Sequence, residues 1–159
     1  MTRFAITIVI LTGCAPHTAD DPSADTDSPS VGPVAGSLVI VGGGGDPGGF
    51  AAFAERAGDR IAYVPTSLED GDSGLEPAHA TDLERWWGFD EVVFVHTRSP
   101  DEADTEAFVT PMDDVTGVWF AGGRQWRLAD SYLGTRAEQA FRDVLDRGGA
   151  IGGSSAGAS

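Results

Sequence analysis

The sequence predicts an α/β protein built on a doubly wound, mostly parallel sheet. Five short apolar runs, rich in β-branched or aromatic residues and bounded by turn residues, recur from Ser37 onward. Stretches with helical spacing of apolar residues separate these runs. Because apolar strands that alternate with helices are typical of a parallel sheet buried on both faces, we expect this arrangement from residue 36 to residue 159.

The expected strands and helices follow one another in strict alternation. The strands are SLVIVG (37–42), RIAYVP (60–65), EVVFVH (91–96), GVWFAG (117–122) and AIGG (150–153). The helices are expected at 50–57, 78–87, 101–108 and 135–147. This order predicts a flavodoxin-like layered sandwich.

The first 14 residues, MTRFAITIVILTGC, have the order of an export signal. Arg3 precedes an apolar stretch at 4–11, which is too short to span a bilayer permanently, and small residues follow it. Residues 11–14 resemble the bacterial lipobox, in which the cysteine is diacylated and becomes the mature N-terminus. We therefore predict an exported lipoprotein of the bacterial cell envelope, anchored to the membrane through Cys14. An ordinary signal peptide and a core strand with a chance cysteine are the alternatives.

Residues 15–35 are predicted to form a disordered tether. The segment contains acidic residues and four prolines but no Lys or Arg, so it cannot bury enough apolar surface to order itself. Proline and mutually repelling carboxylates keep such a spacer extended. Residues 36–159 then form the folded domain.

Composition excludes several classes of function. The formal charge of −15 disfavours nucleic acid as a partner, because phosphate binding needs clustered positive charge. The ten basic residues are all Arg, which excludes a lysine base, a Schiff base or a Walker-type phosphate lysine. With one cysteine and scattered histidines, we expect no metal cluster, no intramolecular disulfide and no cofactor. A homodimer is compatible with the sequence.

The turn after the last expected strand carries the clearest chemical signal. Ligands of open parallel sheets bind outside the carboxyl ends of the strands. There, GSSAG at 153–157 fits the GxSxG pattern of a nucleophile elbow, a serine on a strained turn between a strand and a helix. We predict Ser155 as the nucleophile and the amide of Ala156 as an oxyanion donor. A glycine-rich loop or a phosphate-cradling helix start is the alternative.

The turn after the fourth expected strand, within VWFAGGRQWRL (118–128), offers a second donor. Glycine lets a carbonyl substrate approach the main chain, so we expect the amide of Gly123 to complete the oxyanion hole. Gln125 is predicted to hold a substrate amide or carboxylate. Arg124 and Arg127 are predicted to bind a carboxylate, which arginine engages bidentately. Solvated arginines on a helix are the alternative.

Two weaker signals stay open. The run VGGGGDPGG (41–49) formally matches the GxGxxG dinucleotide fingerprint, but PTS at 65–67 stands where the acidic residue of a Rossmann-type domain is expected. His96 follows the third expected strand and could act as a base for Ser155, although a lone histidine is more often structural.

Taken together, the strand followed by GGG, the segment WFAGGRQWRL and the terminal RGGAIGGSSAGAS resemble peptidase family S51, which contains cyanophycinase and the aspartyl dipeptidases. The specific part of the resemblance is GGxQ followed about thirty residues later by GxSAGA. The resemblance implies a class I glutamine amidotransferase-like fold in which a serine replaces the amidotransferase cysteine.

By position, the resemblance implies Ser155 as nucleophile, Gly123 and Ala156 as oxyanion hole, and Gln125 on the substrate side. It implies peptide or isopeptide substrates with an aspartyl or β-aspartyl residue before the scissile bond. Arg124 stands where members often have an acidic or amide residue.

The family's general base, a histidine with an acidic partner, lies downstream of the serine. We therefore expect that the C-terminal part of the domain is missing from these 159 residues and that this chain alone is nearly inactive. Loss of a triad member costs on the order of 10⁴ in turnover. A noncatalytic ligand-binding lipoprotein with the same sheet is the alternative from another class.

Overall fold

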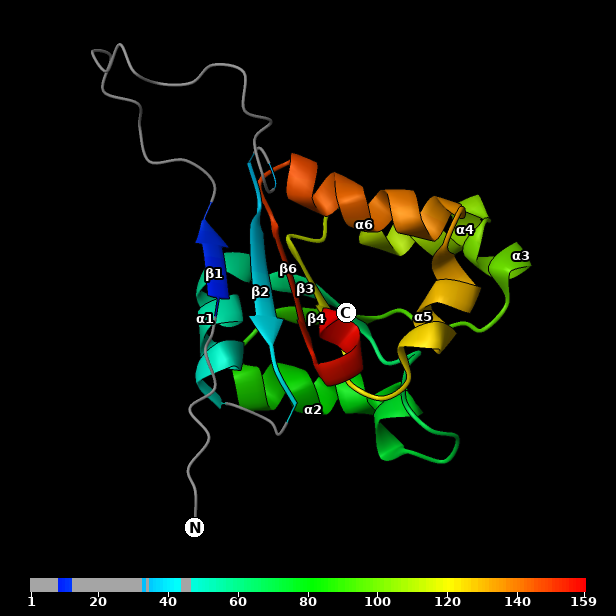
Figure 1. Cartoon of the computed structure of the whole chain (residues 1–159), viewed down its shortest axis with the longest axis horizontal. Helices are drawn as coiled ribbons and strands as arrows, with labels where there is room; N and C mark the ends of the chain where they lie inside the picture. The colour runs from blue at the N-terminus through cyan, green and yellow to red at the C-terminus, as the bar shows by residue number, and fades with distance from the viewer. Residues whose placement is uncertain (1–8, 13–32, 34, 44–46) are drawn as a thin grey trace.

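A computed structural model describes residues 9–12, 33, 35–43 and 47–159. Its strands are β1 (Val9–Thr12), β2 (Ser37–Val41), β3 (Arg60–Val64), β4 (Glu91–Phe94), β5 (Gly117–Phe120) and β6 (Ala150–Ser154). They form one sheet in the order β1-β2-β6-β5-β3-β4 (Figure 1). All neighbours from β2 to β4 in this order are parallel, and β1 pairs antiparallel with β2 at the edge. The mostly parallel sheet expected from the sequence is confirmed.

The helices lie between the strands as the alternation predicts. They are α1 (Pro47–Ala57), α2 (Ala78–Trp87), α3 (Pro100–Ala103), α4 (Glu106–Val109), α5 (Gln125–Tyr132) and α6 (Arg136–Asp146), with short 3₁₀ turns η1 (Ser73–Leu75), η2 (Thr110–Met112) and η3 (Ser155–Ala158). The helix expected at 101–108 is divided in two, because Thr105 caps a new helix by accepting from the Phe108 amide. Helix α5 was not among the expected helices.

The two faces of the sheet carry separate cores. Along β3, Ile61 and Tyr63 pack with residues of α1 and α2, while Ala62 and Val64 pack with residues of α3, α5 and α6. Figure 1 shows the two groups of helices on either side of the sheet. Since every one of these four side chains is at most 5% exposed, the sheet is buried on both faces, as continuous apolar strands require.

Strand β1 falls within the segment predicted as an export signal. It runs beside β2, from Val9 opposite Ile40 to Thr12 opposite Ser37. Cys14 and nearly all of the expected tether lie outside the described residues, so the lipobox and the tether stay predictions. Within the described part of the chain, no helix is both long and apolar enough to cross a bilayer.

The strand order creates a topological switch point at the carboxyl edge of the sheet. The chain moves from β3 outward to β4 and then returns to place β5 on the other side of β3. The loops after β3 and β5 therefore leave in different directions, which is the topological switch point where α/β sheets bind ligands. Strand β6 lies directly beside β5, so the turn after it opens at the same edge.

Candidate active site

Ser155 is the first residue of the 3₁₀ helix η3, directly after β6, and has a strained backbone. Its φ is 52°, and it is the only non-glycine residue with a positive φ within the described residues. A serine in this left-handed region costs free energy that the surrounding structure must supply. The side chain is exposed at the carboxyl edge of the sheet. A positive φ at the serine is one feature of the nucleophile elbow expected for GxSxG, and the catalytic role of Ser155 stays a prediction.

The two glycines of GxSxG are required by close backbone contacts. A Cβ built on Gly153 would lie 2.0 Å from the carbonyl oxygen of Gly157. A Cβ on Gly157 would lie 2.3 Å from the carbonyl oxygen of Phe120. Because both contacts are with backbone, which cannot turn aside like a side chain, any larger residue at either position would open the elbow.

The turn after β5 lies between the elbow and the loop after β3. A Cβ built on Gly122 would be 3.4 Å from the Cβ of Ser155, and one on Gly123 would be 2.1 Å from the carbonyl oxygen of Ser67. Gly123 has a φ of +135° and is exposed. Ala156 is the second residue of η3, and the first N–H groups of a helix have no partner within it. The two expected oxyanion donors therefore belong to adjacent strand ends.

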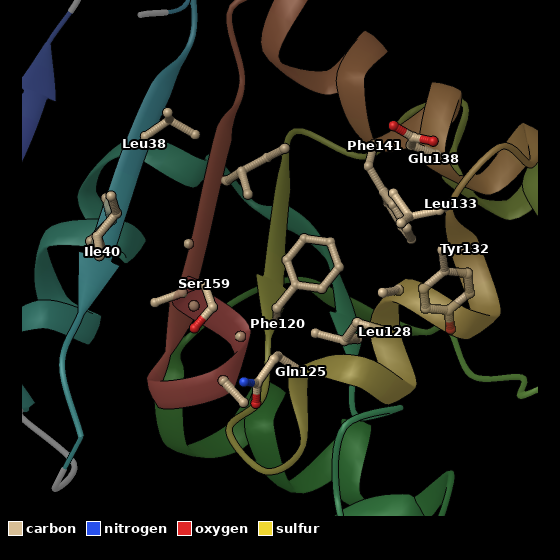
Figure 2. Close-up of a pocket in the computed structure, with 18 of the residues that line it drawn as sticks. Leu38, Ile40, Phe120, Gln125, Leu128, Tyr132, Leu133, Glu138, Phe141 and Ser159 are labelled. Atoms are coloured by element: carbon tan, nitrogen blue, oxygen red, sulfur yellow. The ribbon is translucent and has the colours of Figure 1, made fainter.

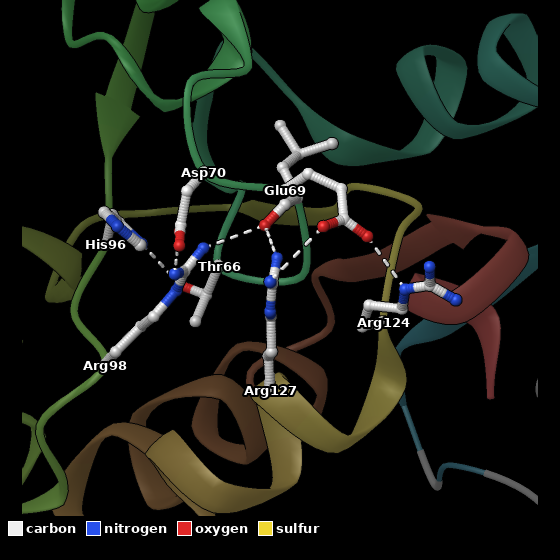
Figure 3. Close-up of polar contacts among 8 residues, drawn as sticks. Thr66, Glu69, Asp70, His96, Arg98, Arg124 and Arg127 are labelled. Atoms are coloured by element: carbon white, nitrogen blue, oxygen red, sulfur yellow. Dashed lines mark hydrogen bonds and ion pairs between the residues drawn. The ribbon is translucent and has the colours of Figure 1, made fainter.

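Arg98 and Arg127 hold the loop after β3, and the more exposed Arg124 pairs with its Glu69 (Figure 3). Arg98 and Arg127 both donate to the carbonyl oxygen of Leu68, and Arg98 also pairs with Asp70. The ion pair with Arg98 lowers the pKa of the Asp70 carboxyl. Sequence reasoning gave no role to this loop, because its partners lie 28 to 59 residues away in the chain.

The two arginines predicted to bind a carboxylate already contact one within the protein. Arg124 Nε donates to Glu69 at 2.8 Å, and Arg127 lies 3.5 Å from the same carboxylate. Their exposure differs: 60% of the Arg124 side chain is exposed, but only 12% of the Arg127 side chain. Arg127 thus supports the loop, while Arg124 faces solvent. Substrate binding by either stays a prediction.

The histidines of the described part of the chain are engaged with groups other than Ser155. His96 Nδ1 lies 2.9 Å from Thr66 Oγ1, which is also 2.6 Å from the hydroxyl of Tyr132. Burial, with a further contribution from Arg98, lowers the pKa of His96. The ring of His79 packs against Tyr63 and Trp86.

An apolar cavity of about 590 Å³ adjoins the elbow (Figure 2). Gln125, Ala156 and Gly157 line this cavity, and the substrate-side role of Gln125 stays a prediction. The apolar lining comes from β2, β5, β6, α5 and α6 and includes Leu38, Ile40, Phe120, Leu128, Leu133, Phe141 and Ile151.

Other predicted sites are only partly covered by the structure. Residues 44–46 of the glycine run that resembles a dinucleotide fingerprint lie outside the described residues. Among the residues that are described, no three His, Cys, Asp or Glu side chains gather where they could hold a metal ion.

Comparison with known proteins decides the family. The protein-family model for peptidase family S51 matches residues 48–159, which is more than half of the chain. The chain belongs to peptidase family S51. The match includes both the GGRQ turn and the GSSAG elbow, so the resemblance stated from the sequence is confirmed. No curated protein matches the chain.

A solved peptidase structure shares the fold. A crystal structure of a peptidase from an acI-B1 Actinobacterium superposes with a TM-score of 0.65 at 24% identity, covering 77% of this chain and 55% of that one. A "Putative Peptidase E Protein" from Listeria monocytogenes EGD-e has a TM-score of 0.47 at 18% identity, covering 68% of this chain and 54% of that one. The chain therefore spans a little over half the length of these two proteins, and the first confirms the α/β fold.

Proposed function

We propose that Ser155 is the nucleophile of a serine-type peptidase that cleaves peptide or isopeptide bonds next to aspartyl residues. The observation that carries this proposal is the positive φ of Ser155, on an elbow whose flanking glycines are fixed by backbone contacts. A nucleophile elbow exposes its serine at the top of the sheet and sets backbone amides beside it. Membership in peptidase family S51 supports the same reaction class.

In the proposed reaction, Ser155 Oγ attacks the carbonyl carbon of the scissile bond. The amides of Gly123 and Ala156 donate to the oxyanion that forms, and such donors act where charge develops in the transition state. The C–N bond breaks, the amine leaves with a proton, and water then hydrolyses the acyl ester of Ser155. A base must move these protons, and the family resemblance implies a histidine with an acidic partner.

His79 and His96 do not fit the role of this base, because each is held by other side chains. Without a base the Ser155 hydroxyl stays a weak nucleophile. We propose the hydrolysis for a protein in which such a base reaches Ser155.

The aspartyl preference is proposed to come from the residues that follow Gly123. Arg124 is largely exposed beside the oxyanion turn, and Gln125 stands at the apolar cavity next to Ala156. A guanidinium can hold a carboxylate through paired hydrogen bonds. In this proposal, Arg124 exchanges Glu69 for the substrate carboxylate, and Gln125 holds a substrate amide.

Covalent labelling of the full-length gene product with a fluorophosphonate tests the proposal. We expect a single adduct that mass spectrometry places on Ser155. Ser154→Ala is the matched control, because it removes the neighbouring hydroxyl and keeps the elbow, and it should label normally. Ser155→Ala should not label. A folded wild-type protein that takes up no reagent would instead favour the noncatalytic, ligand-binding alternative.

We also propose that the protein is exported and anchored through a lipid on Cys14, as its N-terminal sequence predicts. Metabolic labelling with a fatty acid in a bacterial host checks this. Wild-type protein should carry the label and enter the membrane fraction, whereas Cys14→Ser should do neither. Equal labelling of the two proteins would contradict the anchor.

A further inference from the structure

One fully buried serine connects the loop after β3 to the turn after β5. The Ser67 hydroxyl, which has a single hydrogen to donate, lies 2.6 Å from the carbonyl oxygen of Ala121 and 2.8 Å from that of Gly122, so the two carbonyls share it. The carbonyl oxygen of Ser67 accepts from the Arg124 amide at 2.8 Å. Ser67 is 0% exposed, so water cannot replace it in these contacts. Side chain and backbone of this one residue therefore hold both ends of the Gly122–Gly123 turn.

The contact with Gly122 fixes the direction of the next amide. In a trans peptide the C=O and the N–H point in opposite directions, and no cis peptide occurs in the described residues. The Gly122 carbonyl points toward Ser67, on the β3 side of β5. The Gly123 N–H therefore points away from Ser67. Strand β6 and its elbow lie on that other side of β5.

The turn needs such an outside restraint because it consists of two glycines. Glycine accepts both signs of φ at little cost, so the peptide between Gly122 and Gly123 has little intrinsic preference for one orientation. If it turned over, the Gly122 carbonyl would face the elbow and repel a developing oxyanion. With the Gly122 carbonyl held by Ser67, we expect the Gly123 N–H on the elbow side instead.

We infer that Ser67 is a positioning residue that holds the Gly122–Gly123 peptide with its N–H toward Ser155. The inference rests on the proposed function, since it concerns the amide assigned to the oxyanion hole. Ser67 does not touch the reacting atoms. Its hydroxyl acts through Gly122, and loss of that hydroxyl frees the peptide to turn.

Kinetics of Ser67→Ala in the full-length gene product test this. Removing one oxyanion donor costs about 10²- to 10³-fold in turnover, so a freed donor should lower kcat by about 10- to 100-fold. KM should stay within about two-fold, because ground-state binding does not use the oxyanion hole. A peptide aldehyde, which forms a tetrahedral adduct, should lose affinity by a factor similar to kcat, while the cleaved product peptide should bind unchanged. Ser131→Ala, at a serine that is only 2% exposed and lies on α5, controls for loss of a buried hydroxyl.

The outcomes separate this inference from the proposed function. If Ser155 is labelled and a folded Ser67→Ala keeps its kcat and aldehyde affinity, the inference is overturned and the proposed function stands. If Ser155→Ala keeps activity, the proposed function fails whatever Ser67 does. Should Ser67→Ala not fold, Ser67→Cys preserves the size with a weaker donor. We expect a loss of about three- to ten-fold in kcat there, and wild-type turnover in folded Ser67→Cys would also overturn the inference.

Discussion

Gly122 and Ser155 lie side by side at the carboxyl edge of the sheet, where a Cβ built on Gly122 would be 3.4 Å from the Cβ of Ser155. Their strands are neighbours, with Phe120 opposite Gly153, so the turn after β5 and the elbow after β6 begin at the same level. Two glycine-rich segments far apart in the sequence therefore form one structure. Its shape depends on glycine at several close approaches of the backbone.

Gly153→Ala should destabilise the protein because its methyl group would meet the Gly157 carbonyl oxygen at 2.0 Å. Overpacking of a buried site costs about 1–3 kcal/mol, and a contact with backbone belongs at the upper end. Gly43→Ala is the matched control, since among the described residues nothing beyond its chain neighbours lies within 4 Å of a Cβ there. Urea unfolding of the two variants measures the difference. Equal stability would show that the elbow can shift to admit a side chain.

Arg127→Gln should destabilise the protein more than Arg124→Gln does. Arg127 is 12% exposed and donates to the Leu68 carbonyl oxygen, so its loss should cost about 1–2 kcal/mol of unfolding free energy. Arg124 is 60% exposed, so losing its ion pair with Glu69 should change stability by less than about 1 kcal/mol.

Substrate kinetics of the same pair separate support from binding. If Arg124 receives the substrate carboxylate, Arg124→Gln should raise KM for an aspartyl peptide about ten-fold, while Arg127→Gln should change KM less. An Arg124→Gln enzyme with unchanged KM would rule out the proposed role of Arg124.

Much of the fold could be predicted because its signals are local. Apolar runs predicted the positions of β2 to β6, and the GxSxG spacing predicted where the elbow lies. The features that the sequence did not predict depend on contacts between residues far apart in the chain. Helix α5 is short and follows Arg124, which makes no side-chain cap, so little in its own residues marks where it begins.

The sequence also could not predict which polar side chains pair at the site. Arg124 and Glu69 are 55 residues apart in the chain, and so are Ser67 and Gly122. Only the strand order, which sets β5 beside β3, brings these residues together. The sequence predicted that Arg124 and Arg127 bind a substrate carboxylate, whereas in the fold both lie beside the carboxylate of Glu69.

Tyr132→Phe should destabilise the protein more than Tyr63→Phe. The Tyr132 hydroxyl is 2.6 Å from Thr66 Oγ1 and accepts from the Thr97 amide at 3.4 Å, and all three residues are buried. Removing it leaves buried polar partners unpaired, at a cost of about 1–3 kcal/mol. Tyr63 is 5% exposed against 4% for Tyr132, and among the described residues its hydroxyl has no comparable set of hydrogen bonds. Thermal or urea unfolding compares the two, and equal losses would contradict a structural role for the network.

His96 should make the protein less stable as the pH falls below about 6.5. Burial, helped by Arg98, lowers its pKa in the folded protein, although Glu102 and Asp70 act in the opposite direction. The unfolded chain therefore binds a proton at a higher pH than the folded chain does. Because stability rises with pH wherever the unfolded state holds more protons, the contribution of His96 is present above about pH 6.5 and is lost as the pH falls through the lower, folded pKa.

The sign can be checked by urea unfolding between about pH 7.5 and about pH 5.5, above the range where most carboxylates titrate. His96→Gln should flatten the dependence of unfolding free energy on pH in this window. His79→Gln is the matched control and should keep the wild-type slope, because His96 is still in place. A slope that survives in His96→Gln would mean that another group takes up the proton, and that the bond between His96 and Thr66 does not govern stability near neutral pH.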